Sequence, residues 1–182
     1  MGYALARAAE YRGAAVTLVS GPTVLPPPAN ITVIPVISAD QMADAVFAHA
    51  DDADMIIMAA AVGDYTPMSP ASAKIKKTDA QLTVLCDKTC DILAKLGETK
   101  KGRVRIGFAA ETDNLDENAQ KKLVAKHADM IVANRVGQPD TGFASDTNQA
   151  TLFLANNETY PLPAMSKDAL ADIILTTSLK TM

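Results

Sequence analysis

The chain has 182 residues, of which 48% are hydrophobic and 21% are charged, and its formal net charge is -4. This length and apolar content suffice for one hydrophobic core, so we expect a single domain over residues 1–182. The negative charge disfavours a broad nucleic-acid-binding surface but leaves room for a local basic pocket. No apolar run approaches the ~20 residues of a membrane helix, and the first residues lack a signal-peptide pattern. We expect a cytoplasmic protein.

The two cysteines, Cys86 and Cys90, form a CxxxC pattern with no second pair and no histidine beside them. A structural zinc site or a disulfide framework would need further cysteine or histidine ligands at suitable spacings. The pattern therefore indicates neither. No metal ligands are identified from the sequence.

Segments that favour helices alternate with short apolar segments that favour strands. In chain order we expect a helix at 3–11, strands at 15–20 and 31–36, a helix from Ser38 or Asp40 to about His49, strands at 54–60 and 82–86, a helix at 91–97 that closes on Gly97, a strand at 103–110, a helix at 115–127, a strand at 129–136, a turn-rich connection at 141–148, a hairpin of 151–155 and 159–163, and a helix at 166–179. The helix at 115–127 should bury Leu115, Ala119, Leu123 and Val124 on one face.

Near-continuous apolar strands that alternate with amphipathic helices are typical of an α/β doubly wound, Rossmann-like domain. We expect a mostly parallel sheet with helices on both faces and a C-terminal β-hairpin. The chain opens on a helix, whereas the first strand of such a sheet and the glycine turn behind it usually supply the central strand and a phosphate cradle. We therefore expect the first strand to be missing, so that the domain is N-terminally truncated.

Ligands of such folds bind beyond the carboxyl ends of the strands. Suggestive side chains follow these ends or open a helix near them: Asp64 in MAAAVGDY, Phe108 and Glu111 in GFAAET, Asn134 in IVANR, and Cys90 with Asp91 at a helix start. Ordinary turn and capping chemistry explains any one of them alone. The four segments together favour a ligand site.

Six lysines in two groups could neutralise a triphosphate: Lys74, Lys76 and Lys77 in KIKK, and Lys121, Lys122 and Lys126 on the helix at 115–127. The plainer interpretation is a solvated strand edge and an exposed helix face. Lysine nevertheless suits phosphate as a compact point charge, and a flexible lid can bring it in when nucleotide binds.

The ordered motifs resemble, nearly end to end, phosphopantothenoylcysteine synthetase, the ligase domain that most bacteria fuse behind a decarboxylase; they are MGYALA, TLVSGP, AAAVGDY, KIKK, GFAAET and IVANRV. The resemblance implies a CTP-dependent ligation in coenzyme A biosynthesis, with Mg²⁺. The carboxylate of 4'-phosphopantothenate would attack the α-phosphate of CTP and release pyrophosphate, and the amine of cysteine would then displace CMP from the acyl-cytidylate.

The resemblance also implies site residues. Met58, Ala59 and Ala60 would line the nucleotide pocket, and Asp64 would contact the sugar or base side of the nucleotide. Lys74 would be the catalytic lid residue that acts on the reacting phosphates.

A second group would complete the nucleotide site. Cys90, Asp91, Ile92 and Leu93 match a turn of the family that selects cytosine, although the family usually has proline where this chain has Cys90. Proline would fix φ at that helix start and cysteine does not. The other matches, which would pack against the nucleotide or reach its phosphates, are Phe108, Lys122 and Lys126.

The family carries an Asn-His-Ser-Ser-Gly-Lys stretch ahead of the Met-Gly with which this chain opens, and its asparagine handles the acyl-cytidylate. We expect this chain as given to turn over feebly without it. The family also implies a homodimer, with the hairpin and the KIKK lid near the subunit contact, and an associated flavin-dependent decarboxylase. Two alternatives stay open: an NAD(P)-dependent reductase, although GxGxxG is absent from the sequence, and a nucleotide-binding domain without catalysis.

Overall fold

The computed structural model describes residues 1–76, 81–99, 102–111, 114–135 and 147–181, without the side chains of 111 and 135. The helices are α1 (Gly2–Tyr11), α2 (Ala39–Ala50), α3 (Ile92–Glu98), α4 (Leu115–Ala125) and α5 (Lys167–Leu179). The strands are β1 (Thr17–Ser20), β2 (Thr32–Pro35), β3 (Met55–Met58), β4 (Tyr65–Pro67), β5 (Cys86–Lys88), β6 (Val104–Glu111), β7 (Met130–Arg135), β8 (Thr147–Asn148), β9 (Ala150–Leu154), β10 (Thr159–Pro161) and β11 (Met165–Ser166).

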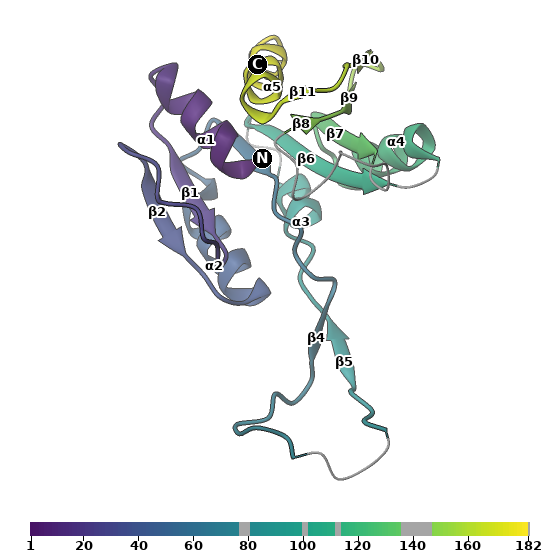
Figure 1. Ribbon diagram of the computed structural model, residues 1–182. Helices are drawn as coiled ribbons and strands as arrows, with labels where there is room; N and C mark the ends of the chain where they lie inside the picture. Colours follow the sequence, from purple (N-terminus) through teal and green to yellow (C-terminus); the bar gives the residue numbers. More distant parts are fainter. Residues whose placement is uncertain (77–80, 100–101, 112–113, 136–146, 182) are drawn as a thin grey trace.

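The central sheet has five strands in the order β10-β9-β7-β6-β3 (Figure 1). Strands β3, β6 and β7 are parallel, whereas β9 and β10 run antiparallel as the expected C-terminal hairpin. The α/β class is confirmed, and the sheet is mixed. Strands β1 and β2 form a separate parallel pair that is not hydrogen-bonded to the described edge strand β3.

The register of the parallel strands brings their carboxyl ends to one edge of the sheet. Met58, the last residue of β3, pairs with Gly107 of β6. Further along, Ala110 of β6 pairs with Asn134 of β7. The residues that leave β3, β6 and β7 therefore start from neighbouring positions, as the fold class requires.

Helices cover both faces of this sheet. Ile106 and Val132 are fully buried on the face that packs against α1 and α5, in one cluster with Leu170 and Ile174. On the other face, residues of α4 such as Ala119 pack with the alternate strand residues. The period of two in the strands thus divides the apolar side chains between two cores. A third cluster joins α2, α3 and β2.

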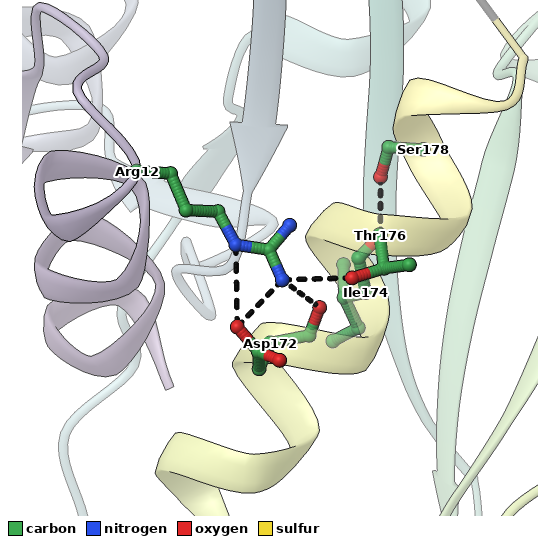
Figure 2. A network of polar contacts seen from close by, with 5 residues as sticks. All are labelled: Arg12, Asp172, Ile174, Thr176 and Ser178. Atoms are coloured by element: carbon green, nitrogen blue, oxygen red, sulfur yellow. Dashed lines mark hydrogen bonds and ion pairs between the residues drawn. The ribbon is translucent and has the colours of Figure 1, made fainter.

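Polar contacts near the surface join α1 to α5 (Figure 2). The Arg12 guanidinium donates to the Asp172 carboxylate at 2.5 Å, to the Asp172 carbonyl at 2.8 Å and to the Thr176 hydroxyl at 2.7 Å. Within α5, the buried Ser178 hydroxyl donates to the Ile174 carbonyl at 2.5 Å, so it has a partner inside its own helix. Arg12 is the C-cap residue of α1, so its side-chain contacts join the C-terminal end of α1 to α5.

One expected element is wrong. Residues 82–86 do not form a buried strand, because β5 begins only at Cys86 and pairs antiparallel with the unexpected strand β4. We call the segment from β4 to β5 the arm; it projects from the body of the molecule in Figure 1. Leu82 and Leu85 are 66% and 70% exposed. Their apolar character suggested burial, but no sheet or helix covers the arm.

Three smaller expectations also differ. Val124 is 73% exposed. Leu115, Ala119 and Leu123 follow one another at intervals of four residues and are buried on one face of α4, whereas Val124 is one residue further along and points away from that face. Helix α3 does not close on Gly97 but runs through Glu98, with Thr99 as its C-cap. The short pair β8–β11 was not expected. The turn-rich connection at 141–148 falls outside the described residues except for 147 and 148.

Candidate functional site

The chain that leaves β3 opens the candidate site. Met58 and Ala59 are half-buried, and each packs against an apolar cluster of the body. Ala60 is exposed, and with the next three residues it lines a pocket of about 250 Å³. Gly21, Ser38 and Met42 close the pocket from the exit of β1 and the start of α2. Small residues at both strand exits leave this space open to a ligand.

The base of the arm brings a second predicted segment to the same place. The Thr89 hydroxyl donates to the Gly63 carbonyl at 2.6 Å, and the Thr89 amide donates to the Asp64 carbonyl at 3.0 Å. Asp64 is exposed, and Cys90 follows Thr89 directly. The predicted nucleotide residue after β3 and the predicted base-selecting turn are therefore neighbours, although 26 positions separate Asp64 from Cys90.

The predicted base-selecting turn opens α3. Asp91 is the N-cap, and its carboxylate accepts from the Ala94 amide at 3.0 Å. Ile92 is buried beside Leu96, whereas Leu93 leans over β6 at Gly107. A Cβ at Gly107 would lie 2.5 Å from Leu93 Cδ2, so only glycine lets Leu93 sit there. The glycine of GFAAET thus sets how closely α3 approaches the sheet.

Helix α4 contributes the two predicted phosphate lysines, both half-buried. Lys126 forms an ion pair with the Asp91 carboxylate and so links α4 to the turn. The Lys126 backbone N–H donates to the Lys122 carbonyl oxygen at 2.9 Å, so Lys122 lies one helical turn before Lys126. The exposed Lys121 is paired with Glu117 at 2.6 Å.

Two side chains near the strand ends differ in their surroundings. Phe108 is half-buried and packs against the core cluster that includes Ile106. Asn134 lies near the end of β7, and its Oδ1 is a buried acceptor with no hydrogen-bond partner among the described residues. A buried carbonyl oxygen without a partner is unfavourable unless something else satisfies it. At a strand exit, a ligand can do so.

The predicted catalytic lysine is not brought to this edge. Lys74 is exposed and lies between β4 and β5, in the segment at the far end of the arm in Figure 1. The arm would have to move for Lys74 to reach the strand exits. Lys77 and the side chain of Glu111 lie outside the described residues.

Neither a metal cluster nor a membrane span is found in the described parts of the chain. Within the described side chains, no three histidine, cysteine, aspartate or glutamate residues come together as a metal site. No described helix is long and apolar enough to cross a membrane. Magnesium commonly binds through one or two carboxylates together with substrate phosphates, and the exposed carboxylate of Asp64 suits that mode.

The comparison with known proteins identifies the family. The model of the DNA/pantothenate metabolism flavoprotein C-terminal domain matches residues 1–181. The chain belongs to this family. The resemblance expected from the motifs is confirmed at this level.

Relatives and solved structures agree with the assignment. The chain is 46% identical over 168 residues to the coenzyme A biosynthesis bifunctional protein CoaBC of Bacillus subtilis. The aligned segment covers 92% of this chain and 41% of that protein. The chain thus spans less than half the length of that relative. The crystal structure of a CoaBC C-terminal domain matches with a TM-score of 0.81 at 40% identity, covering 97% of this chain and 79% of the other. A Cab2 mutant in complex with phosphopantothenate-cysteine matches with a TM-score of 0.64 at 17% identity, over 84% of this chain and 53% of the other, which supports the fold alone.

A second pocket, larger than the one at the exit of β3, lies away from the strand exits. It has a volume of about 320 Å³ and lies between the β9–β10 hairpin and α5. The Tyr160 hydroxyl at its rim donates to Glu158 at 2.6 Å. This hydrogen bond lowers the pKa of Glu158 and raises the pKa of Tyr160. We assign the functional site to the exit of β3 and the smaller pocket there, because Ala60 lines that pocket and Asp64 directly follows Gly63 of its lining.

Sequence reasoning missed two residues that shape the site of this domain: Thr89 and Gly107. Gly107 lies in the motif GFAAET, but nothing in the neighbouring sequence shows that a larger residue there would clash with another element. Thr89 acts through a bond to a carbonyl far away in the chain. Such partners are set by tertiary structure and leave no local pattern.

Proposed function

We propose that this domain ligates 4'-phosphopantothenate with cysteine, using CTP and an acyl-cytidylate intermediate, in coenzyme A biosynthesis. One observation supports it most: the exits of β3 and β6, the turn at Cys90–Leu93 and the lysine-bearing helix α4 meet around one sheet edge. Family membership and the name of the Bacillus relative support the pathway. The Cab2 complex holds the compound that this reaction would produce.

The chemistry needs two anions to meet. A carboxylate oxygen of 4'-phosphopantothenate attacks the α-phosphorus of CTP, the bond to the β-phosphate oxygen breaks, and pyrophosphate leaves. The cysteine amine then attacks the acyl carbon, loses a proton, and displaces CMP. Lysine ammonium groups and backbone N–H groups stabilise the charge that develops on the phosphoryl oxygens.

The described residues divide this work. Residues 58–60 and Phe108 would line the nucleotide pocket, with Asp64 at the sugar or base side. Lys122 would contact the phosphates, and Lys74 would act on the reacting phosphates after the arm closes. Mg²⁺ arriving with the triphosphate would neutralise part of its charge.

We further propose a homodimer in the cytoplasm and an association with a flavin-dependent decarboxylase domain. The arm supports the homodimer, since its exposed apolar residues include Tyr65 at 61% and Met68 at 56%. Clustered exposed apolar side chains are typical of a protein contact surface. The name of the Bacillus relative, a bifunctional protein, supports the association with a further domain.

The test is Lys74→Gln in the natural full-length protein, with pyrophosphate release and CTP affinity measured separately. We expect turnover to fall by about 10²–10³, since removing one donor to a developing charge has effects of that order, while CTP affinity changes much less. The control is Lys88→Gln, which removes a lysine from β5 of the same arm. Unchanged turnover removes Lys74 from the mechanism, and CTP binding without pyrophosphate release in the wild type favours a non-catalytic domain.

A further inference from the structure

The first turn of α5 lies at the same edge of the sheet as the candidate site. Arg7 of α1 donates to the Asp168 carboxylate of α5 at 2.9 Å, and the contacts in Figure 2 join the two helices again further along both of them. The two helices therefore run side by side in the same direction and begin at the same end of the sheet. An added Cβ at Gly2 would lie 3.9 Å from the Ala59 side chain, so this end is the exit of β3.

Lys167 is the first residue of α5 and lies near the start of α1. Burial lowers the pKa of the Met1 amine, and the positive charges of Lys167 and Arg7 lower it further, so both cations are close to Met1. Met1, Ala59 and Phe108 pack against the apolar cluster that α1 and α5 share with the sheet. Lys167 is therefore a cation beside the exits of β3 and β6.

The Lys167 ammonium is half-buried and lacks a described partner. Three of the lysines whose side chains the structure describes are half-buried: Lys122, Lys126 and Lys167. Lys126 pairs with Asp91, and Lys122 has a partner as well. Lys167 has neither a hydrogen bond nor an ion pair for its ammonium among the described residues. Partial removal of an ammonium from water is unfavourable unless an anion compensates it.

The position of Lys167 on its helix is also electrostatically unfavourable. The N-terminal end of a helix carries partial positive charge, so a cation in the first turn is disfavoured. The acidic residue of that turn, Asp168, pairs with Arg7. The neighbouring start of α1 adds to the positive potential, because Met1 makes no side-chain cap and the first turn has no acidic residue. A cation kept at a position that breaks a local rule is typical of a functional site.

The face of the sheet separates Lys167 from the lysines assigned to the triphosphate. Lys122 belongs to α4, which packs on the opposite face from α5, and Lys74 belongs to the arm. The proposed reaction brings a further anion to this edge, the carboxylate of cysteine. None of the residues assigned to the nucleotide accounts for it.

We propose that Lys167 binds the carboxylate of the incoming cysteine. The inference rests on the proposed function and names a residue for its amino-acid substrate. An ammonium donates charge-assisted hydrogen bonds to a carboxylate, and holding that group orients the amine for attack on the acyl carbon.

Cysteine and cysteamine test this in the natural full-length protein. Both carry the attacking amine and the thiol, and only cysteine carries the carboxylate. The wild type should favour cysteine in kcat/KM for amide formation. Lys167→Gln should lower kcat/KM for cysteine about 10–100-fold, the effect of one charge-assisted hydrogen bond, and leave kcat/KM for cysteamine unchanged. A wild type without the preference, or a preference that survives in Lys167→Gln, overturns the proposal.

A second measurement separates the carboxylate from phosphate. The KM for CTP and inhibition by inorganic pyrophosphate both report phosphate binding, and both should be unchanged in Lys167→Gln. If both weaken while the preference for cysteine stays, Lys167 is a phosphate ligand and the assignment to cysteine is overturned.

Two matched variants make the test specific. Lys167→Arg keeps the cation and should retain most of the preference for cysteine. Lys180→Gln removes the exposed lysine at the other end of α5 and should leave both amines unaffected. Loss of the preference in Lys180→Gln as large as in Lys167→Gln overturns the proposal, because the effect would then not be specific to the first turn.

The wild type distinguishes failure of this inference from failure of the proposed function. A wild type that forms no amide from CTP, 4'-phosphopantothenate and cysteine overturns the proposed function and this assignment with it. An active wild type whose preference is unaltered in the Lys167 variants overturns this inference alone.

Discussion

The Thr89 hydroxyl donates a hydrogen bond to the Gly63 carbonyl oxygen at 2.6 Å and so joins the exit of β3 to the start of α3. The two residues stand at the base of the arm, with β4 and β5 paired beyond them. This bond holds the two strands of the arm together at the point where they leave the body. We therefore expect any movement of the arm to pivot at or beyond this bond.

Thr89→Val removes the donor while keeping the shape of the side chain. We expect the free energy of unfolding to fall by about 1 kcal/mol, the net value of one such hydrogen bond. CTP affinity should fall several-fold, because the segments around Asp64 and Cys90 are no longer tied together. Urea unfolding and calorimetric titration measure the two effects. Thr89→Ser keeps the hydroxyl and is the control; identical behaviour of the valine and serine variants would contradict the role of the bond.

Replacing Asn134, unlike replacing Thr89, should not destabilise the ligand-free protein. Its Oδ1 is buried without a partner among the described residues, and such an acceptor is unfavourable by about 1–3 kcal/mol. Asn134→Ala should therefore leave the free energy of unfolding of the ligand-free protein unchanged or raise it, while CTP affinity falls about tenfold as a contact to the ligand is lost. A variant that is destabilised yet binds CTP normally would show that Asn134 serves the fold and not the site.

Gly107→Ala tests the close approach of α3 to the sheet. The added Cβ would lie 2.5 Å from Leu93 Cδ2 and 2.8 Å from Ile131 Cδ1, so we expect a loss of about 1–3 kcal/mol from overpacking. Removing the Leu93 side chain in Leu93→Ala/Gly107→Ala should relieve part of the strain, and the double variant should be less destabilised than the sum of the two single ones. Urea unfolding measures all three. Gly21→Ala, where no atom lies within 4 Å of the new Cβ, is the stability control; additive effects of the first two changes would argue against the contact.

Arg12→Ala should weaken the packing of α1 on α5. Arg12 is 29% exposed and its partner Asp172 is 65% exposed, so we expect about 1 kcal/mol after allowing for solvent screening. Arg7→Ala, which removes the more exposed pair with Asp168, should have a smaller effect. Urea unfolding at low and at high salt measures both variants. An Arg7 variant as destabilised as the Arg12 variant would show that the contacts with the Asp172 carbonyl and Thr176 add nothing.

Local pattern predicted much of the fold. The alternation of apolar strands with amphipathic helices predicted the α/β class and all five described helices, because period and propensity act over a few residues. The strand at 54–60 became β3, and the hairpin at 151–155 and 159–163 became β9 and β10. The segment at 82–86 failed for a physical reason. An apolar run indicates a strand only where another surface covers it, and the arm has none.

The sequence by itself determined the five helices, most strands of the central sheet and which residue types stand at their ends, since these follow from neighbours along the chain. Only the tertiary structure decided that Lys126 meets Asp91, that Thr89 meets Gly63 and that Leu93 needs a glycine at 107. Each of these pairs lies 14 or more positions apart in the sequence. Their contacts depend on how whole elements pack, and packing is decided by the summed fit of many side chains rather than by any one segment.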